Sequence, residues 1–165
     1  MKLKVKDITL IAILSVVLFV QKEVLSFLPN ISLTVFLIVL YSKKLGLSNT
    51  LLIIAIYCIL DNLIMNSFNI IFTPFVFIGW ALIPLMLNTV FKKVDNVLSL
   101  SLLGILFSFL YSWIYLIPNV LVLNVNPIAY LASDSIFEII LAISSFVSIL
   151  WLYKPCSKVI DIITK

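Results

Sequence analysis

The sequence contains no histidine and no arginine, and its three glycines lie far apart at Gly46, Gly79 and Gly104. The missing side chains exclude Ser-His-Asp and Cys-His catalysis, the HExxH zinc helix and bidentate arginine clamps on phosphate. Because the chain has no glycine-rich phosphate loop, it cannot bind and hydrolyse ATP in the usual way. We therefore expect a protein that is not an enzyme.

Charged residues and cysteines are also scarce. Charged side chains make up 11% of the chain, whereas about 25% is typical of soluble domains. The two cysteines, Cys58 and Cys156, lie far apart and form no CxxC pair. We expect neither a disulfide nor a metal site from them, and no cofactor.

Hydrophobic residues, by contrast, make up 64% of the 165 residues, and the mean hydropathy is +1.29. Such a chain lacks the polar groups that cover the surface of a soluble protein. The composition excludes a soluble enzyme, a nucleic-acid binder and a disordered protein. It predicts a protein whose solvent is the lipid bilayer.

Long apolar runs predict the transmembrane segments. A transmembrane helix needs about 20 residues, so the chain has room for about six and for no separate extramembrane domain. Continuous runs favour helices over the alternating pattern of a barrel strand. The fold class is therefore an all-α integral membrane protein, a six-transmembrane-helix bundle in a single domain over residues 1–165. The expected spans are residues 8–25, 31–41, 47–60, 70–90, 98–116 and 134–153.

The lysines predict the orientation of these spans. With six spans and an inner N-terminus, ten of the eleven lysines lie on the inner side and only Lys22 lies outside. This distribution satisfies the positive-inside rule and places both termini in the cytoplasm. The outer side then holds four carboxylates, those of Glu23, Asp61, Asp134 and Glu138.

Residues 117–133 are expected to form a long outer connection. The segment is nearly uncharged and contains Pro118, Asn119, Asn124, Asn126 and Pro127. Long connections in compact proteins often carry function, although some are merely irregular.

Polar residues from several segments converge on this outer level and predict a binding pocket. They include Glu23 at the end of the first span, and Asp61, Asn62 and Asn66 between the third and fourth spans. The asparagines would line a pocket or merely solvate a loop.

Asp134 and Glu138 lie one helical turn apart near the start of the last span. Ionisable groups within a span are costly and often functional. Asp134 would alternatively cap the helix.

Three aromatic residues are further candidates for contact with a ligand. Tyr111 and Trp113 lie near the outer end of the fifth span, where an aromatic belt is the alternative explanation. Trp80 lies between Gly79 and Ala81 in a run that contains Pro74 and Pro84. It would stack on a flat ligand or fill space in the core.

The run Leu28-Pro29-Asn30-Ile31-Ser32-Leu33-Thr34 follows a lysine-led first helix, and the last helix closes with Leu152-Tyr153-Lys154-Pro155. In these segments the chain resembles the substrate-binding (S) components of energy-coupling factor (ECF) transporters. Size, span count and cytoplasmic termini agree, so the resemblance covers essentially the whole chain.

The resemblance implies a multi-pass subunit of a prokaryotic cell membrane that captures a vitamin or related micronutrient from outside. It also implies docking onto a transmembrane coupling subunit that two ATPases drive. Family members carry an alanine-x-x-x-alanine face on the first helix for this contact. Here Ala12 is followed by Val16, with Ser15 adjacent, so the second alanine is missing. Small residues allow close helix packing in lipid, and Ala12, Ser15 and Val16 form the candidate surface for the coupling subunit.

The site residues expected for the solute are Glu23, Asp61, Asn62, Asn66, Trp80, Tyr111, Trp113, Asp134 and Glu138. The acidic excess favours a neutral or cationic solute over a polyanion. The alternative function is a structural membrane scaffold, similar to the small multi-span subunit of the rod-shape cell-wall machinery. That subunit shares a proline-led second span and an aspartate after the third, here Pro29 and Asp61.

Overall fold

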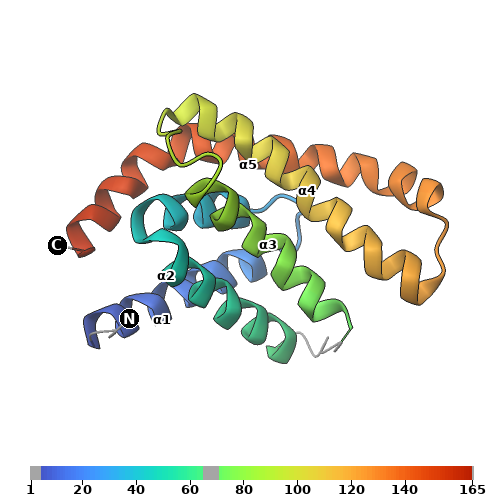
Figure 1. Ribbon diagram of the computed structural model, residues 1–165, viewed down its shortest axis with the longest axis horizontal. Coiled ribbons are helices and arrows are strands. Elements are labelled where there is room, and N and C mark those ends of the chain that lie inside the picture. The colour runs from blue at the N-terminus through green and yellow to red at the C-terminus, as the bar shows by residue number, and fades with distance from the viewer. Residues whose placement is uncertain (1–4, 65–70, 165) are drawn as a thin grey trace.

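The computed structural model describes residues 5–64 and 71–164, and these residues form helices joined by short connections (Figure 1). No strand occurs within those two ranges, so the all-α prediction is confirmed for them. The helices are α1 (Val5–Val24), α2 (Thr34–Ile64), α3 (Phe72–Asn88), α4 (Val97–Leu123) and α5 (Pro127–Thr164).

Three of the described helices, α2, α4 and α5, have the length and composition of segments that cross a bilayer, and α3 is a shorter apolar helix. Large apolar side chains such as Ile13, Leu102 and Trp151 are exposed on the outside of the bundle. A soluble protein rarely exposes so much apolar surface. The chain is therefore a membrane-embedded protein.

Helix α2 is a hairpin of two helical arms. Thr34 at its start and Asp61 near its end both line one cavity, although a straight helix would place them about 40 Å apart. Gly46 breaks the helix with φ 77° and ψ 179°, a conformation essentially restricted to glycine. Residues 34–45 form the first arm, and residues 47–64 run back beside it (Figure 1).

The first arm of α2 forms the centre of the core. Every residue from Thr34 to Ser42 is buried, so this arm has no face exposed to lipid. Leu18 of α1, Ile53 of the second arm, Leu100 of α4 and Ile149 of α5 belong to the same buried cluster. At about 1.5 Å per residue the first arm is about 18 Å long, and the surrounding helices enclose it.

Gly46→Ala is expected to lower the free energy of unfolding by about 1–3 kcal/mol. A Cβ atom at this position would meet nothing within 4 Å, so the whole cost is backbone strain at the turn of the hairpin. Thermal unfolding in detergent measures the loss. Ser48→Ala on the exposed side of the second arm is the control, with an expected change below about 0.5 kcal/mol. Equal effects of the two variants would show that the turn does not need a glycine.

The prediction of a long irregular connection over residues 117–133 is wrong. Helix α4 continues to Leu123, α5 begins at Pro127, and only residues 124–126 separate them. Asn124 ends α4 with φ 52° and ψ 33°, the left-handed conformation of a helix C-cap. Asn126 Oδ1 accepts hydrogen bonds from the N–H of Ile128 at 2.9 Å and of Ala129 at 3.3 Å, as an N-cap does. Pro127 occupies a first-turn position that needs no N–H donor.

Candidate functional site

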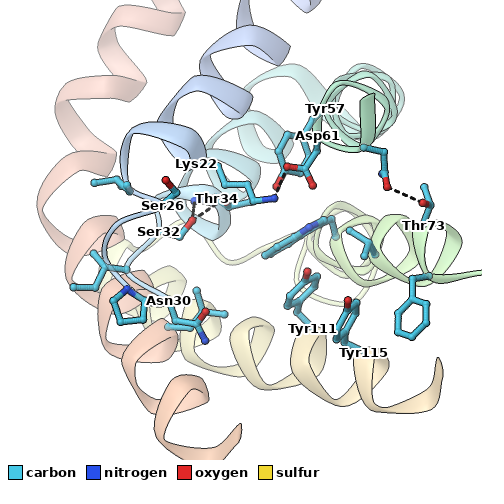
Figure 2. A pocket seen from close by; sticks show the side chains of 18 of the residues that line it. Lys22, Ser26, Asn30, Ser32, Thr34, Tyr57, Asp61, Thr73, Tyr111 and Tyr115 are labelled. Atoms are coloured by element: carbon cyan, nitrogen blue, oxygen red, sulfur yellow. Dashed lines mark hydrogen bonds and ion pairs between the residues drawn. The ribbon is translucent and has the colours of Figure 1, made fainter. Parts of the chain in front are cut away.

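A cavity of about 820 Å³ lies among the five helices and the connection between α1 and α2 (Figure 2). All five helices and this connection contribute lining residues. The volume falls within the range of about 300–1,000 Å³ that is typical of small-molecule sites. The cavity is therefore the candidate functional site.

An ion pair joins two helices at this cavity. Lys22 Nζ at the end of α1 donates a hydrogen bond to Asp61 Oδ1 on the second arm of α2. The Lys22 side chain is 38% exposed and that of Asp61 is 14% exposed. Lys22 Nζ also lies 6.0 Å from the centroid of the Tyr57 ring, which is at the outer limit of a cation–π contact. The cavity wall therefore contains one ammonium group and one carboxylate group, which are paired with each other.

Asn62 links α2 to α3 beside the ion pair. Its Nδ2 atom donates to Cys58 O at 2.6 Å, and its Oδ1 atom accepts from Thr73 Oγ1 at 3.0 Å. Both ends of the amide are thus engaged in the structure. This arrangement holds the end of α2 against the start of α3.

Aromatic rings form the wall contributed by α3 and α4. The rings of Trp80 and Tyr111 are stacked, with centroids 3.8 Å apart and planes at 18°. Tyr115 lies one turn further along α4, with its centroid 6.4 Å from that of Tyr111 and its plane at 17° to it. Trp80 is 5% exposed, and its Nε1–H has no hydrogen-bond acceptor among the described residues. The wall thus carries a buried donor that no acceptor in the described part of the chain pairs with.

Gly79 permits the contact between Trp80 and Tyr111. A Cβ atom on Gly79 would lie 2.8 Å from Tyr111 Cδ2, whereas one on Gly104 would lie 2.6 Å from Ile149 Cδ1. Tyr111 Cδ2 belongs to a packed ring that cannot move alone, whereas Ile149 Cδ1 is a terminal methyl group that is able to rotate away.

Gly79→Ala is therefore expected to lower the free energy of unfolding by about 1–3 kcal/mol, because it moves Tyr111 off the indole. Gly104→Ala is the matched variant. Gly104 lies on α4 and faces Ile149 of α5, and its substitution should lower the free energy of unfolding by less. Thermal midpoints and the near-ultraviolet circular dichroism of the aromatic stack measure both. A greater loss in Gly104→Ala would contradict the assigned role of the Tyr111 ring.

The connection between α1 and α2 lies along the cavity, and hydrogen bonds from α1 and α5 hold the end that leads into α2. Gln21 accepts from the N–H of Leu33 at 3.0 Å and donates to Thr34 Oγ1 at 2.8 Å. Ser144 of α5 accepts from the N–H of Ser32 at 3.2 Å and donates to its carbonyl at 3.0 Å. In Figure 2 Asn30 and Ser32 lie on one side of the cavity, and Tyr111 and Tyr115 lie on the other.

Four of the expected site residues line this cavity, and others lie elsewhere. The four are Asp61, Asn62, Trp80 and Tyr111. Asn66 lies outside the described residues. Glu23, Trp113, Asp134 and Glu138 are not among the lining residues. Trp113 is exposed on the outside of the bundle.

The three remaining carboxylates have separate environments. Asp134 Oδ2 accepts a hydrogen bond from Ser112 Oγ of α4 at 2.5 Å. Glu138 is 6% exposed. Its Oε1 atom, like Oε1 of Glu23, is buried without a hydrogen-bond partner in the part of the chain that is described. The structure therefore does not gather the acidic residues into one cluster.

The candidate docking residues on α1 divide between two faces. Ala12 and Val16 are exposed on the outside. Ser15 is fully buried, and its hydroxyl donates to Ile11 O at 2.7 Å. Because its side chain is fully buried, Ser15 is not available for contact with a partner, and Ala12 is the small residue left on the exposed face.

Several lining residues are not among the expected solute contacts. They include Lys22, Tyr57, Thr73 and Tyr115, together with the connecting segment around Asn30. Lys22 and Asn30 are polar residues that the expected spans place at the outer level, so the sequence carried a signal for them. Tyr57 carried none, since a buried ligand wall and a buried core use the same apolar and aromatic residues.

Comparison of the chain with known protein families, with curated proteins and with solved structures finds no match.

Proposed function

We propose that the protein is a solute-binding subunit of a membrane importer, of the S-component type, and that it takes a small organic micronutrient. The observation that carries this proposal is the cavity of about 820 Å³ among five apolar helices. Its lining joins an ion pair, amide and hydroxyl groups to an aromatic wall. A few polar groups in a mostly apolar concave site are typical of small-molecule recognition.

The proposal includes six membrane-crossing segments with both termini in the cytoplasm. The reversal at Gly46 supports it, because α2 supplies two arms and the described helices then supply six helical segments, of which the short first arm is enclosed by the others. The start of α1 and the end of α5 lie at the same end of the bundle (Figure 1). Lys43 pairs with Asp95 and Lys44 with Asp161, so three of the segments assigned to the inner side meet there.

Energy for import would come from partners. The sequence has no phosphate-binding loop, so an ATPase pair and a membrane coupling subunit would drive transport. The exposed face of α1 around Ala12 and Val16 is the proposed contact with the coupling subunit. A small residue on such a face allows another helix to approach closely.

Affinity purification of the tagged chain from its native membranes tests the partner. We expect two ATPases and a membrane coupling protein to be recovered with it and identified by mass spectrometry. Ala12→Trp should reduce their recovery, whereas Ile143→Trp on the exposed face of α5 should not. Recovery of cell-wall synthesis proteins without ATPases would favour a scaffold. Equal recovery of the ATPases with Ala12→Trp would contradict the assigned docking face.

A further inference from the structure

The charge of the cavity wall limits the charge of the solute. Lys22 and Asp61 are the only charged residues that line the cavity among the described residues, and they are paired with each other. A phosphorylated solute would find one ammonium group that is already neutralised, and no second cation. A cation would likewise find one carboxylate that is already paired. The wall thus matches a solute of zero net charge.

The unpaired indole of Trp80 indicates where the solute has a hydrogen-bond acceptor. The residue lines the cavity and is 5% exposed, and its Nε1–H has no acceptor among the described residues. Buried donors are nearly always paired. A carbonyl oxygen or an unprotonated ring nitrogen of a bound solute would complete this hydrogen bond.

The aromatic wall indicates the shape of the solute. Tyr111 and Tyr115 present two rings with planes at 17° along one side of the cavity. Figure 2 shows the two rings side by side, across the cavity from Asn30. Offset stacking on rings such as these favours flat, delocalised molecules over saturated ones.

From these three observations we propose that the solute is a planar heteroaromatic compound of zero net charge, which accepts a hydrogen bond from Trp80 Nε1–H. This inference rests on the proposed solute-binding function and adds the chemical class of the solute. Asp61 and Lys22 remain paired when such a solute is bound. The acidic residues that do not line the cavity play no part in its recognition.

A matched probe series in a single-tryptophan protein tests the class. The variant Trp113→Phe/Trp151→Phe leaves Trp80 as the only tryptophan, and both replaced residues are exposed. We expect quinoline-3-carboxamide to quench Trp80 fluorescence with an affinity about tenfold higher than that of the other three probes. These are quinoline-3-carboxylate, N-methylquinolinium-3-carboxamide and cyclohexanecarboxamide, which differ in charge or planarity. Equal affinities, tighter binding of a charged probe, or no quenching by any probe would overturn the inference.

Trp80→Phe tests the hydrogen bond separately. The variant keeps a ring beside Tyr111 and removes a donor that has no acceptor within residues 5–64 and 71–164. We expect affinity for quinoline-3-carboxamide, measured by equilibrium dialysis at a temperature where the variant is folded, to fall about tenfold. The affinity for cyclohexanecarboxamide, which has no ring nitrogen, should fall less. Unchanged affinity for quinoline-3-carboxamide, or an equal loss for both probes, would overturn the assigned contact. If the ATPases are recovered with the tagged protein but its solute proves to be charged or saturated, this inference is refuted and the proposed function is not. If the ATPases are not recovered, the proposed function itself is refuted.

Discussion

Lys22→Met and Asp61→Asn are each expected to lower the free energy of unfolding by about 1–3 kcal/mol. Each variant leaves one charge of the cavity ion pair without its partner, and the remaining charge is partly withdrawn from water. The Asp61 side chain is only 14% exposed, so its carboxylate gains little from solvent when Lys22 is removed. Thermal or denaturant unfolding in detergent measures both losses.

The double variant Lys22→Met/Asp61→Asn should recover part of the loss, because it leaves no charge unpaired. The same cycle at Lys44 and Asp161 is the control, since that pair lies outside the cavity and its Asp161 side chain is 50% exposed. Its coupling energy should be about 0–1 kcal/mol. A cavity pair whose coupling is no larger than that of the control would show that solvent screens it.

Glu138→Met is expected to raise the free energy of unfolding by about 1–3 kcal/mol. The Glu138 side chain is 6% exposed, and its Oε1 atom has no hydrogen-bond partner among the described residues. Methionine keeps a similar length and removes the unpaired polar atom. Since Glu138 does not line the cavity, binding of quinoline-3-carboxamide should not change.

Asp134→Leu is the matched control for Glu138→Met. Asp134 accepts a hydrogen bond from Ser112 at 2.5 Å, so its removal leaves a hydroxyl without a partner and should not stabilise the protein. A loss of stability in Glu138→Met would show that the carboxyl has partners essential to the fold. A loss of binding would show that Glu138 reaches the solute.

Much of the fold could be predicted from the sequence because its hydrophobic composition indicates that the chain is surrounded by lipid. Long apolar runs predict helices, and the structure has helices at these runs. The expected segments 31–41 and 47–60 correspond to the two arms of α2, because Gly46 and the adjacent lysines interrupt the apolar pattern. The connection before α5 is much shorter than the predicted residues 117–133, since Asn124 and Asn126 cap helices as readily as they form loops.

The site was harder to predict because helix rotation decides which side chains meet. Asp61 and Trp80 line the cavity, but Trp113 lies on the outside, two positions after Tyr111. Asp134 and Glu138 share one helix face, and neither lines the cavity. Lys22 and Asp61 lie far apart in the sequence, and no local pattern pairs them. Only the hairpin at Gly46 brings Thr34 and Asp61 to the same space.

The small molecules released from the purified protein test the proposed binding most directly. Mass spectrometry of the denatured wild-type protein should find one neutral aromatic compound in an amount close to that of the protein. Val76→Trp fills part of the cavity and should abolish this compound, whereas Val122→Trp on the outside of α4 should not. If the wild type releases nothing, or Val76→Trp releases the same compound in equal amount, the cavity is not a binding site.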